Sequence, residues 1–169
     1  MKTNTKKIAL TAMFAAVAVV GSMFSFPFLG SKCAPVQHLV NILAGIILGP
    51  VWGVIAAFIA SLIRNLTGLG SLFAFPGSMV GAFLAGFLYK KIKKLPAAYI
   101  GELFGTAVIG GMLCFPIAKF IMGNEAAALF TFVFPFFASS LGGTIIAIIV
   151  TVALQKAGVL SKMINEVNN

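Results

Sequence analysis

The chain has 169 residues, of which 60% are hydrophobic and only 9% are charged, and its mean hydropathy is +1.10. A soluble domain is about 45–50% apolar and about one quarter charged, so this composition excludes an ordinary water-soluble protein and predicts a surface solvated by lipid. The formal charge of +9 does not indicate a nucleic-acid binder, because the basic residues lie at the ends of apolar runs, where they favour anionic lipid headgroups.

Glycine, proline and charged residues divide the chain into six apolar segments, each of which we expect to be helical. The segments cover residues 8–29, 39–48, 51–66, 76–89, 97–121 and 126–154. The first follows a basic lead, as in a signal peptide, but no cleavage site precedes a hydrophilic domain, so we expect a retained helix. Segments two to four are shorter than the roughly 20 residues that a straight membrane span needs. Three explanations stay open: the bilayer is thin there or the helices cross it tilted, additional helical residues lie in the polar loops, or the spans are incomplete.

The distribution of lysine predicts how these segments are oriented. Cytoplasmic loops collect Lys and Arg, so the four lysines within residues 90–94 and both basic chain ends are expected inside the cell. Six crossings place most basic residues inside (Lys2, Lys6, Lys7, Lys90, Lys91, Lys93, Lys94, Lys156 and Lys162) and three at the outer face (Lys32, Arg64 and Lys119). We therefore predict an all-α, six-transmembrane-helix bundle, a single multi-pass domain of the cell membrane over residues 1–169 with short cytoplasmic tails at both termini.

The connection between the first two segments is dense in hydrogen-bonding groups and returns directly into an apolar helix. Gln37, His38 and Asn41 lie within about one helical turn, and Gln37 and Asn41 share a face because they are four residues apart. Polar side chains at membrane depth are candidates for a binding site; the alternative is an ordinary loop with a helix cap. A neutral His38 ring offers one donor and one acceptor to a heterocycle, and we expect no metal site, because no further ligands accompany it.

A second polar cluster, Arg64 and Asn65, ends the third segment and leads into a glycine-rich loop that contains Phe73 and Phe75. Such a loop suits a lid over a small aromatic ligand, with Asn65 opposite the first cluster. Arg64 has an alternative, which is to extend its guanidinium to lipid headgroups.

Two further polar positions lie in the last two segments. Glu102 lies within about two helical turns of the lysine loop, so pairing with Lys93 or Lys94 and a role toward substrate or coupling both stay open. Ser139 follows Pro135 by four residues, and we expect hydroxyls there mainly to satisfy carbonyls that the proline frees.

Small residues four apart predict close helix packing. Ala12 and Ala16 form such a face on the first segment, where it can dock another protein, whereas the pairs in segments four and five are expected to pack within the bundle (Gly77 and Gly81; Gly101 and Gly105). Cys33 and Cys114 are expected to be buried free thiols, although both fall toward the outer side and a bridge stays open.

Six short helices, cytoplasmic termini, the Ala12/Ala16 face and the lack of a nucleotide-binding P-loop resemble the substrate-binding S components of energy-coupling factor (ECF) vitamin transporters. Several stretches resemble the ThiW family within that group. They are residues 32–41, 64–65, 75–82, 101–106 and 139–143, so the resemblance covers nearly the whole chain.

The resemblance implies a non-enzymatic subunit without cofactors, which binds hydroxyethylthiazole, the thiazole precursor of thiamine, near the outer face. It also implies partners: a transmembrane coupling protein and two ATPase subunits, with release of substrate by toppling in the bilayer. The alternatives are an S component for another small vitamin or precursor, and a structural or regulatory membrane protein. The candidate binding residues are Gln37, His38, Asn41, Asn65, Phe73 and Phe75, followed by Lys32, Arg64, Glu102 and Ser139.

Overall fold

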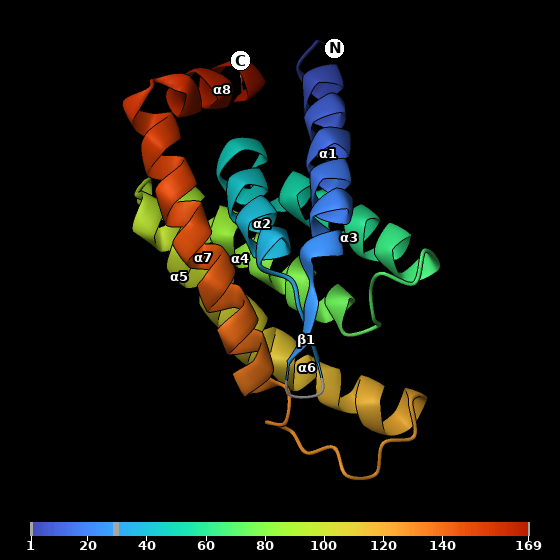
Figure 1. The fold of residues 1–169 in the computed structure, drawn as a ribbon. Coiled ribbons are helices and arrows are strands. Elements are labelled where there is room, and N and C mark those ends of the chain that lie inside the picture. Colours follow the sequence, from blue (N-terminus) through green and yellow to red (C-terminus); the bar gives the residue numbers. More distant parts are fainter. Residues whose placement is uncertain (1, 29–30, 169) are drawn as a thin grey trace.

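The computed structural model describes residues 2–28 and 31–168, apart from the side chains of residues 2–4, 31 and 168. Predictions that concern Leu29, Gly30 and the side chains of Lys2 and Ser31 lie outside the described residues. The chain forms a helical bundle (Figure 1). Its helices are α1 (Lys2–Gly21), α2 (Pro35–Leu48), α3 (Pro50–Leu66), α4 (Ala74–Ile92), α5 (Leu95–Phe104), α6 (Gly111–Pro116), α7 (Val133–Lys156) and α8 (Val159–Asn168).

A π-helical turn, Gly105–Gly110, connects α5 to α6, and a second one, Ile117–Ile121, extends α6 at its end. Together they form one helical stretch of 27 residues, Leu95–Ile121. Among the described residues, three stretches are long and apolar enough to cross a membrane: this one, Thr5–Phe24 and Val133–Lys156. The all-α class is confirmed, while six crossings and their orientation remain predictions.

Proline sets the starts of the short helices that surround the cavity described below. Pro35 and Pro50 occupy the first turn of α2 and α3, where the missing N–H removes no helical hydrogen bond and φ is already suitable. Gly49 joins the two helices with a φ of 85°, which residues with a side chain adopt only rarely. Because α2 begins at Pro35 rather than at residue 39, Gln37 and His38 belong to the helix and not to a loop.

The first segment does not stay helical to its predicted end. After α1 comes a single 3₁₀ turn, η1 (Ser22–Phe24), and then an antiparallel hairpin of β1 (Phe26–Phe28) with β2 (Ser31–Cys33). Pro27 lies within β1, opposite Lys32, and proline removes a backbone donor and clashes with a preceding helical turn. The helix prediction was therefore wrong for residues 25–28.

The last segment differs from the prediction at both ends. Residues 126–132 form turns, and α7 begins at Val133. The polar tail that was expected after the sixth segment is largely the helix α8, which Leu160 and Val167 anchor in the apolar core, where they are 3% and 2% exposed. The turn at Gly158, with a φ of 71°, lets α8 fold back toward α1.

Helix α4 lies at the centre of the bundle and contacts α2, α3 and α5. Glycine allows its backbone to approach α5 closely: a Cβ at Gly101 would lie 2.5 Å from the carbonyl oxygen of Leu84, and one at Gly105 would lie 2.9 Å from that of Val80. The prediction that the glycine pairs of segments four and five pack within the bundle is confirmed.

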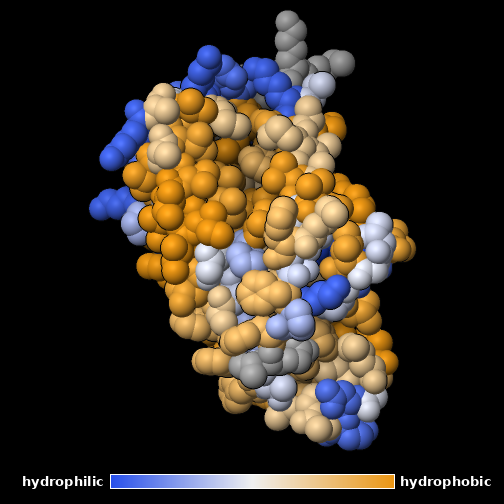
Figure 2. All heavy atoms as spheres, in the orientation of Figure 1, coloured by the Kyte–Doolittle hydropathy of each residue, from blue (hydrophilic) through white to orange (hydrophobic). Residues whose placement is uncertain are grey.

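Both chain ends lie at the same end of the molecule (Figure 1), where Lys6 Nζ donates to the backbone oxygen of Glu166 at 3.1 Å. Figure 2 shows hydrophobic atoms over most of the visible face and hydrophilic atoms gathered at the end that carries the termini, with smaller hydrophilic groups near the middle and at the opposite end. This distribution is the one expected of a protein whose flanks face lipid.

Candidate functional site

A cavity lies where α2, α3, α4 and α7 meet, beside the hairpin. Its empty space, counted together with the open mouth, is about 420 Å³. Aromatic rings and polar groups both contribute to its wall. The lining residues are Lys32, Ala34, Gln37, His38, Arg64, Ser71, Phe73, Ala74, Gly77, Ser78, Thr106, Phe136 and Ser139.

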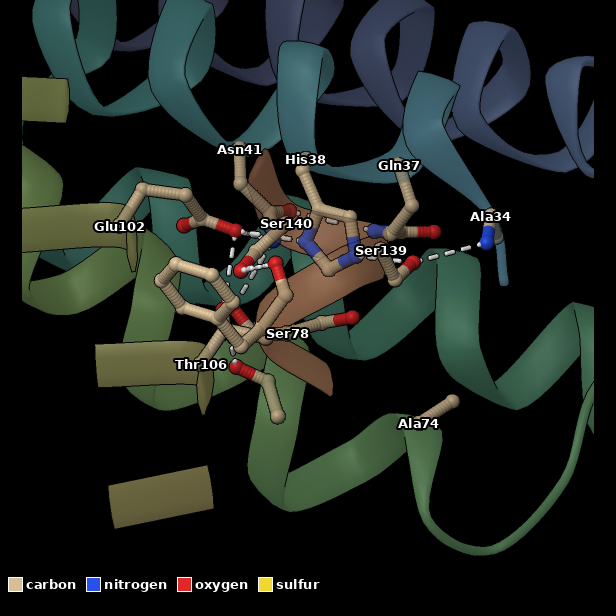
Figure 3. Close-up of polar contacts among 12 residues, drawn as sticks. Ala34, Gln37, His38, Asn41, Ala74, Ser78, Glu102, Thr106, Ser139 and Ser140 are labelled. Atoms are coloured by element: carbon tan, nitrogen blue, oxygen red, sulfur yellow. Dashed lines mark hydrogen bonds and ion pairs between the residues drawn. The ribbon is translucent and has the colours of Figure 1, made fainter. Parts of the chain in front are cut away.

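The polar wall is centred on His38, which projects from the first turn of α2 between two other helices (Figure 3). Its Nδ1 lies 2.8 Å from Glu102 Oε1 on α5, and its Nε2 lies 3.0 Å from Ser139 Oγ on α7. Ser139 Oγ also accepts a hydrogen bond from the backbone N–H of Ala34 at 2.9 Å. Three segments far apart in sequence are therefore tied together around one imidazole.

The surroundings of Glu102 fix the protonation pattern. Besides His38, Asn41 Nδ2 at 3.1 Å and Thr106 Oγ1 at 2.9 Å surround the same carboxylate oxygen, Oε1. Oε1 therefore acts as a shared acceptor, while Oε2 is buried without a hydrogen-bond partner among the described residues. We therefore assign the Nδ1–H tautomer to His38, with Nε2 accepting the hydroxyl hydrogen of Ser139.

A second chain of hydrogen bonds leads from Glu102 to a buried cation. Asn41 Oδ1 accepts from Gln37 Nε2 at 3.1 Å, and Gln37 Oε1 accepts from Arg64 Nη1 at 2.8 Å. Both amides present oxygen toward the cation and nitrogen toward the anion, so their dipoles align with the field between Arg64 and Glu102. The predicted shared face of Gln37 and Asn41 is confirmed and forms the middle of this chain.

Two alternatives from the sequence are excluded by these contacts. Arg64 is 3% exposed and turned into the bundle, so it does not extend to lipid headgroups. Glu102 is fully buried and contacts His38, whereas Lys93 and Lys94 are exposed beyond the end of α4, so the predicted pairing with a lysine was wrong.

The hydroxyl of Ser139 also serves a different purpose from the one expected. Pro135 lies in the first turn of α7, where a proline frees no helical carbonyl, so there is nothing for Ser139 to satisfy. The adjacent Ser140 does bond a backbone carbonyl, that of Phe137, at 3.2 Å.

Cys33 and Cys114 are buried free thiols.

The remaining candidates surround the cavity in different ways. Lys32 lies at its mouth, and Phe73 lines it and packs on Phe132 with a ring-centroid distance of 4.5 Å. Asn65 lies outside the lining and donates to Ser61 O and Ser71 O, which holds the glycine-rich loop against α3. Phe75 also lies outside it and packs against Phe58.

Sequence reasoning missed part of the lining. Phe136 forms an apolar wall, and Ser78 O accepts a hydrogen bond from Asn41 Nδ2 at 3.2 Å. Thr106 had a usable signal, because it follows Glu102 by one helical turn and so shares its face. No comparable signal marked Phe136 among the 17 phenylalanines of the chain.

Away from the cavity, α1 presents an apolar face without a partner among the described residues. Ala12 and Ala16 are both exposed on it, whereas Ala15 and Ala18 are buried against the bundle. Met13, Val17 and Val20 extend the same exposed face and are between 46% and 61% exposed.

Comparison with known proteins gives one match. A family model described as thiamine-precursor transporter protein (ThiW) matches residues 8–157. No curated protein and no solved structure matches the chain. The matched range includes every residue of the polar wall.

Proposed function

Because the chain belongs to the ThiW family of thiamine-precursor transporter proteins, we propose that it is the substrate-binding S component of an ECF-type importer and that its ligand is hydroxyethylthiazole. The observation that carries the proposal is the cavity, which combines a hydrogen-bonded polar wall with aromatic side chains in its lining. Binding without chemical conversion is all that this role requires.

The chemistry of the thiazole matches both kinds of wall. Its ring can lie against Phe73 and Phe136, while the ring nitrogen and the hydroxyl need only a few polar contacts. Gln37, His38 and Ser139 also line the cavity, and both ring nitrogens of His38 are bonded within the protein, to Glu102 and Ser139. The network behind them holds these side chains in place, so that little rotamer freedom is lost when the ligand binds.

In the proposed mechanism the protein crosses the cell membrane six times, with both termini in the cytoplasm and the cavity toward the outer face. A coupling membrane protein and two ATPase subunits supply the energy that this chain cannot supply itself. The exposed face around Ala12 and Ala16 is the proposed contact with the coupling protein, since small residues allow two helix backbones to approach closely.

The binding site is tested by removing single polar groups. We expect His38→Ala, which removes a side chain of the lining, and Asn41→Ala, which removes the support behind Gln37, to weaken hydroxyethylthiazole binding by roughly three- to a hundredfold, because each loses hydrogen bonds and leaves buried partners unpaired. Calorimetric titration of the folded variants measures the effect. Gln155→Ala, which removes an exposed amide at the end of α7, is the control and should bind as the wild type does. Wild-type affinity in both test variants would move the site away from this wall.

The orientation is tested by single-cysteine labelling in intact cells, in a background that lacks Cys33 and Cys114. A cysteine at Lys93 should be protected from an impermeant reagent, and one at Lys32 should react, because the lysine-rich loop is expected inside. Reaction at residue 93 together with protection at residue 32 would reverse the proposed orientation.

A further inference from the structure

The surroundings of Arg64 call for a partner that the chain itself does not provide. Its side chain is 3% exposed, and within the described part of the chain its guanidinium makes one hydrogen bond, from Nη1 to Gln37 Oε1. Nε is buried there without a partner. Buried guanidinium groups normally contact a carboxylate or another anion, because an unpaired buried charge is strongly destabilising.

No acid of the chain is placed to fill this role. The sequence has three acidic residues, Glu102, Glu125 and Glu166. Glu102 contacts His38 and is linked to Arg64 only through the amide side chains of Asn41 and Gln37. Glu125 is exposed on the turn before α7, and Glu166 is exposed on α8. The nearest negative charge therefore does not contact the guanidinium.

The part of the cavity lining that contains Arg64 carries only positively charged side chains among its charged residues. Arg64 and Lys32 both line the cavity, and among the described residues no acidic side chain does so. Lys32 Nζ donates to Gly68 O at 3.3 Å and to Leu69 O at 3.1 Å, which keeps the ammonium group beside the glycine-rich loop. Charges of one sign around a partly enclosed site of low dielectric attract a ligand of the opposite sign.

We propose that the cavity binds a ligand that carries an oxyanion, and that Arg64 Nε donates a hydrogen bond to it while Lys32 attracts it at the mouth. This inference rests on the proposed function and specifies its ligand class: a small heterocycle with a phosphate or carboxylate substituent. Guanidinium donors match such oxyanions in both geometry and charge. A neutral alcohol presents an oxygen to the same donor without the charge and binds more weakly.

Titration of the purified protein in a neutral detergent, with hydroxyethylthiazole and with its phosphate monoester, tests the proposal. We expect the ester to bind at least tenfold more tightly than the alcohol. In Arg64→Gln this preference should disappear, in Arg64→Lys it should be retained in part, and in Lys119→Gln, a cation outside the cavity, it should be unchanged. Equal affinities in the wild type, or a full preference in Arg64→Gln, would overturn the inference and leave the proposed function standing.

A second measurement covers the case in which Arg64→Gln does not fold. Raising the salt concentration should weaken ester binding to the wild type and leave alcohol binding nearly constant, because only the ester is held by charge; equal salt dependence would contradict the proposal. Micelles doped with phosphatidylglycerol should not compete with the ester, and competition would assign the anion site to lipid headgroups instead. Failure of both thiazoles to bind would overturn the proposed function itself.

Discussion

Replacing Glu102 with leucine is expected to lower the free energy of unfolding by about 3–5 kcal/mol, the usual effect of removing one partner of a buried ion pair or charged network. The change leaves the buried donors of His38, Asn41 and Thr106 without their common acceptor. Unfolding of the purified protein in detergent, followed by circular dichroism, measures the loss.

Glu102→Gln should destabilise less than the leucine substitution, because an amide oxygen at the position of Oε1 can still accept from the same donors. Glu125→Gln is the matched control, since Glu125 lies exposed in the turn before α7 and should leave stability unchanged. Wild-type stability in Glu102→Leu would mean that the network does not hold α2, α5 and α7 together.

The second large effect concerns transport. Ala16→Trp is expected to abolish uptake of the thiazole while leaving binding by the isolated protein intact. Ala16 is exposed on α1 and far from the cavity lining, so an indole there disturbs a docked helix and not the ligand. On a close-packed interface the added bulk separates the backbones and loses their dispersion contacts.

Uptake in whole cells, together with co-purification of the coupling protein, distinguishes the two steps. Ala153→Trp places the same side chain on an exposed position of α7 and should transport normally. Normal uptake by Ala16→Trp would remove the docking site from α1, and loss of ligand binding would show that the substitution damages the bundle itself.

Local patterns predicted the features of this protein that depend on neighbours in sequence. The spacing of Gln37 and Asn41 placed them on one face, and the Gly101/Gly105 pair indicated the close approach of α4 and α5, because both follow from the geometry of a single helix. The Ala12/Ala16 face is likewise a property of one helix, and the structure shows it exposed. The helical class followed from composition alone.

Contacts between distant segments could not be predicted in the same way. His38 and Glu102 are 64 residues apart, and nothing in either segment indicates that they meet rather than Glu102 and the nearer lysines. The position of Ser139 depends on where α7 begins, which the apolar run from residue 126 concealed. The hairpin at Pro27 was obscured because its first strand, β1, is as apolar as the helix before it.

The central claim is that this chain alone forms the binding site for a thiamine precursor. Calorimetric titration of the purified wild-type protein, without coupling or ATPase subunits, with hydroxyethylthiazole tests it most directly. We expect saturable binding of one ligand per chain, weakened in His38→Ala. A folded protein that shows no heat of binding and no ligand-induced rise in melting temperature would contradict it, and would favour a structural or regulatory membrane protein.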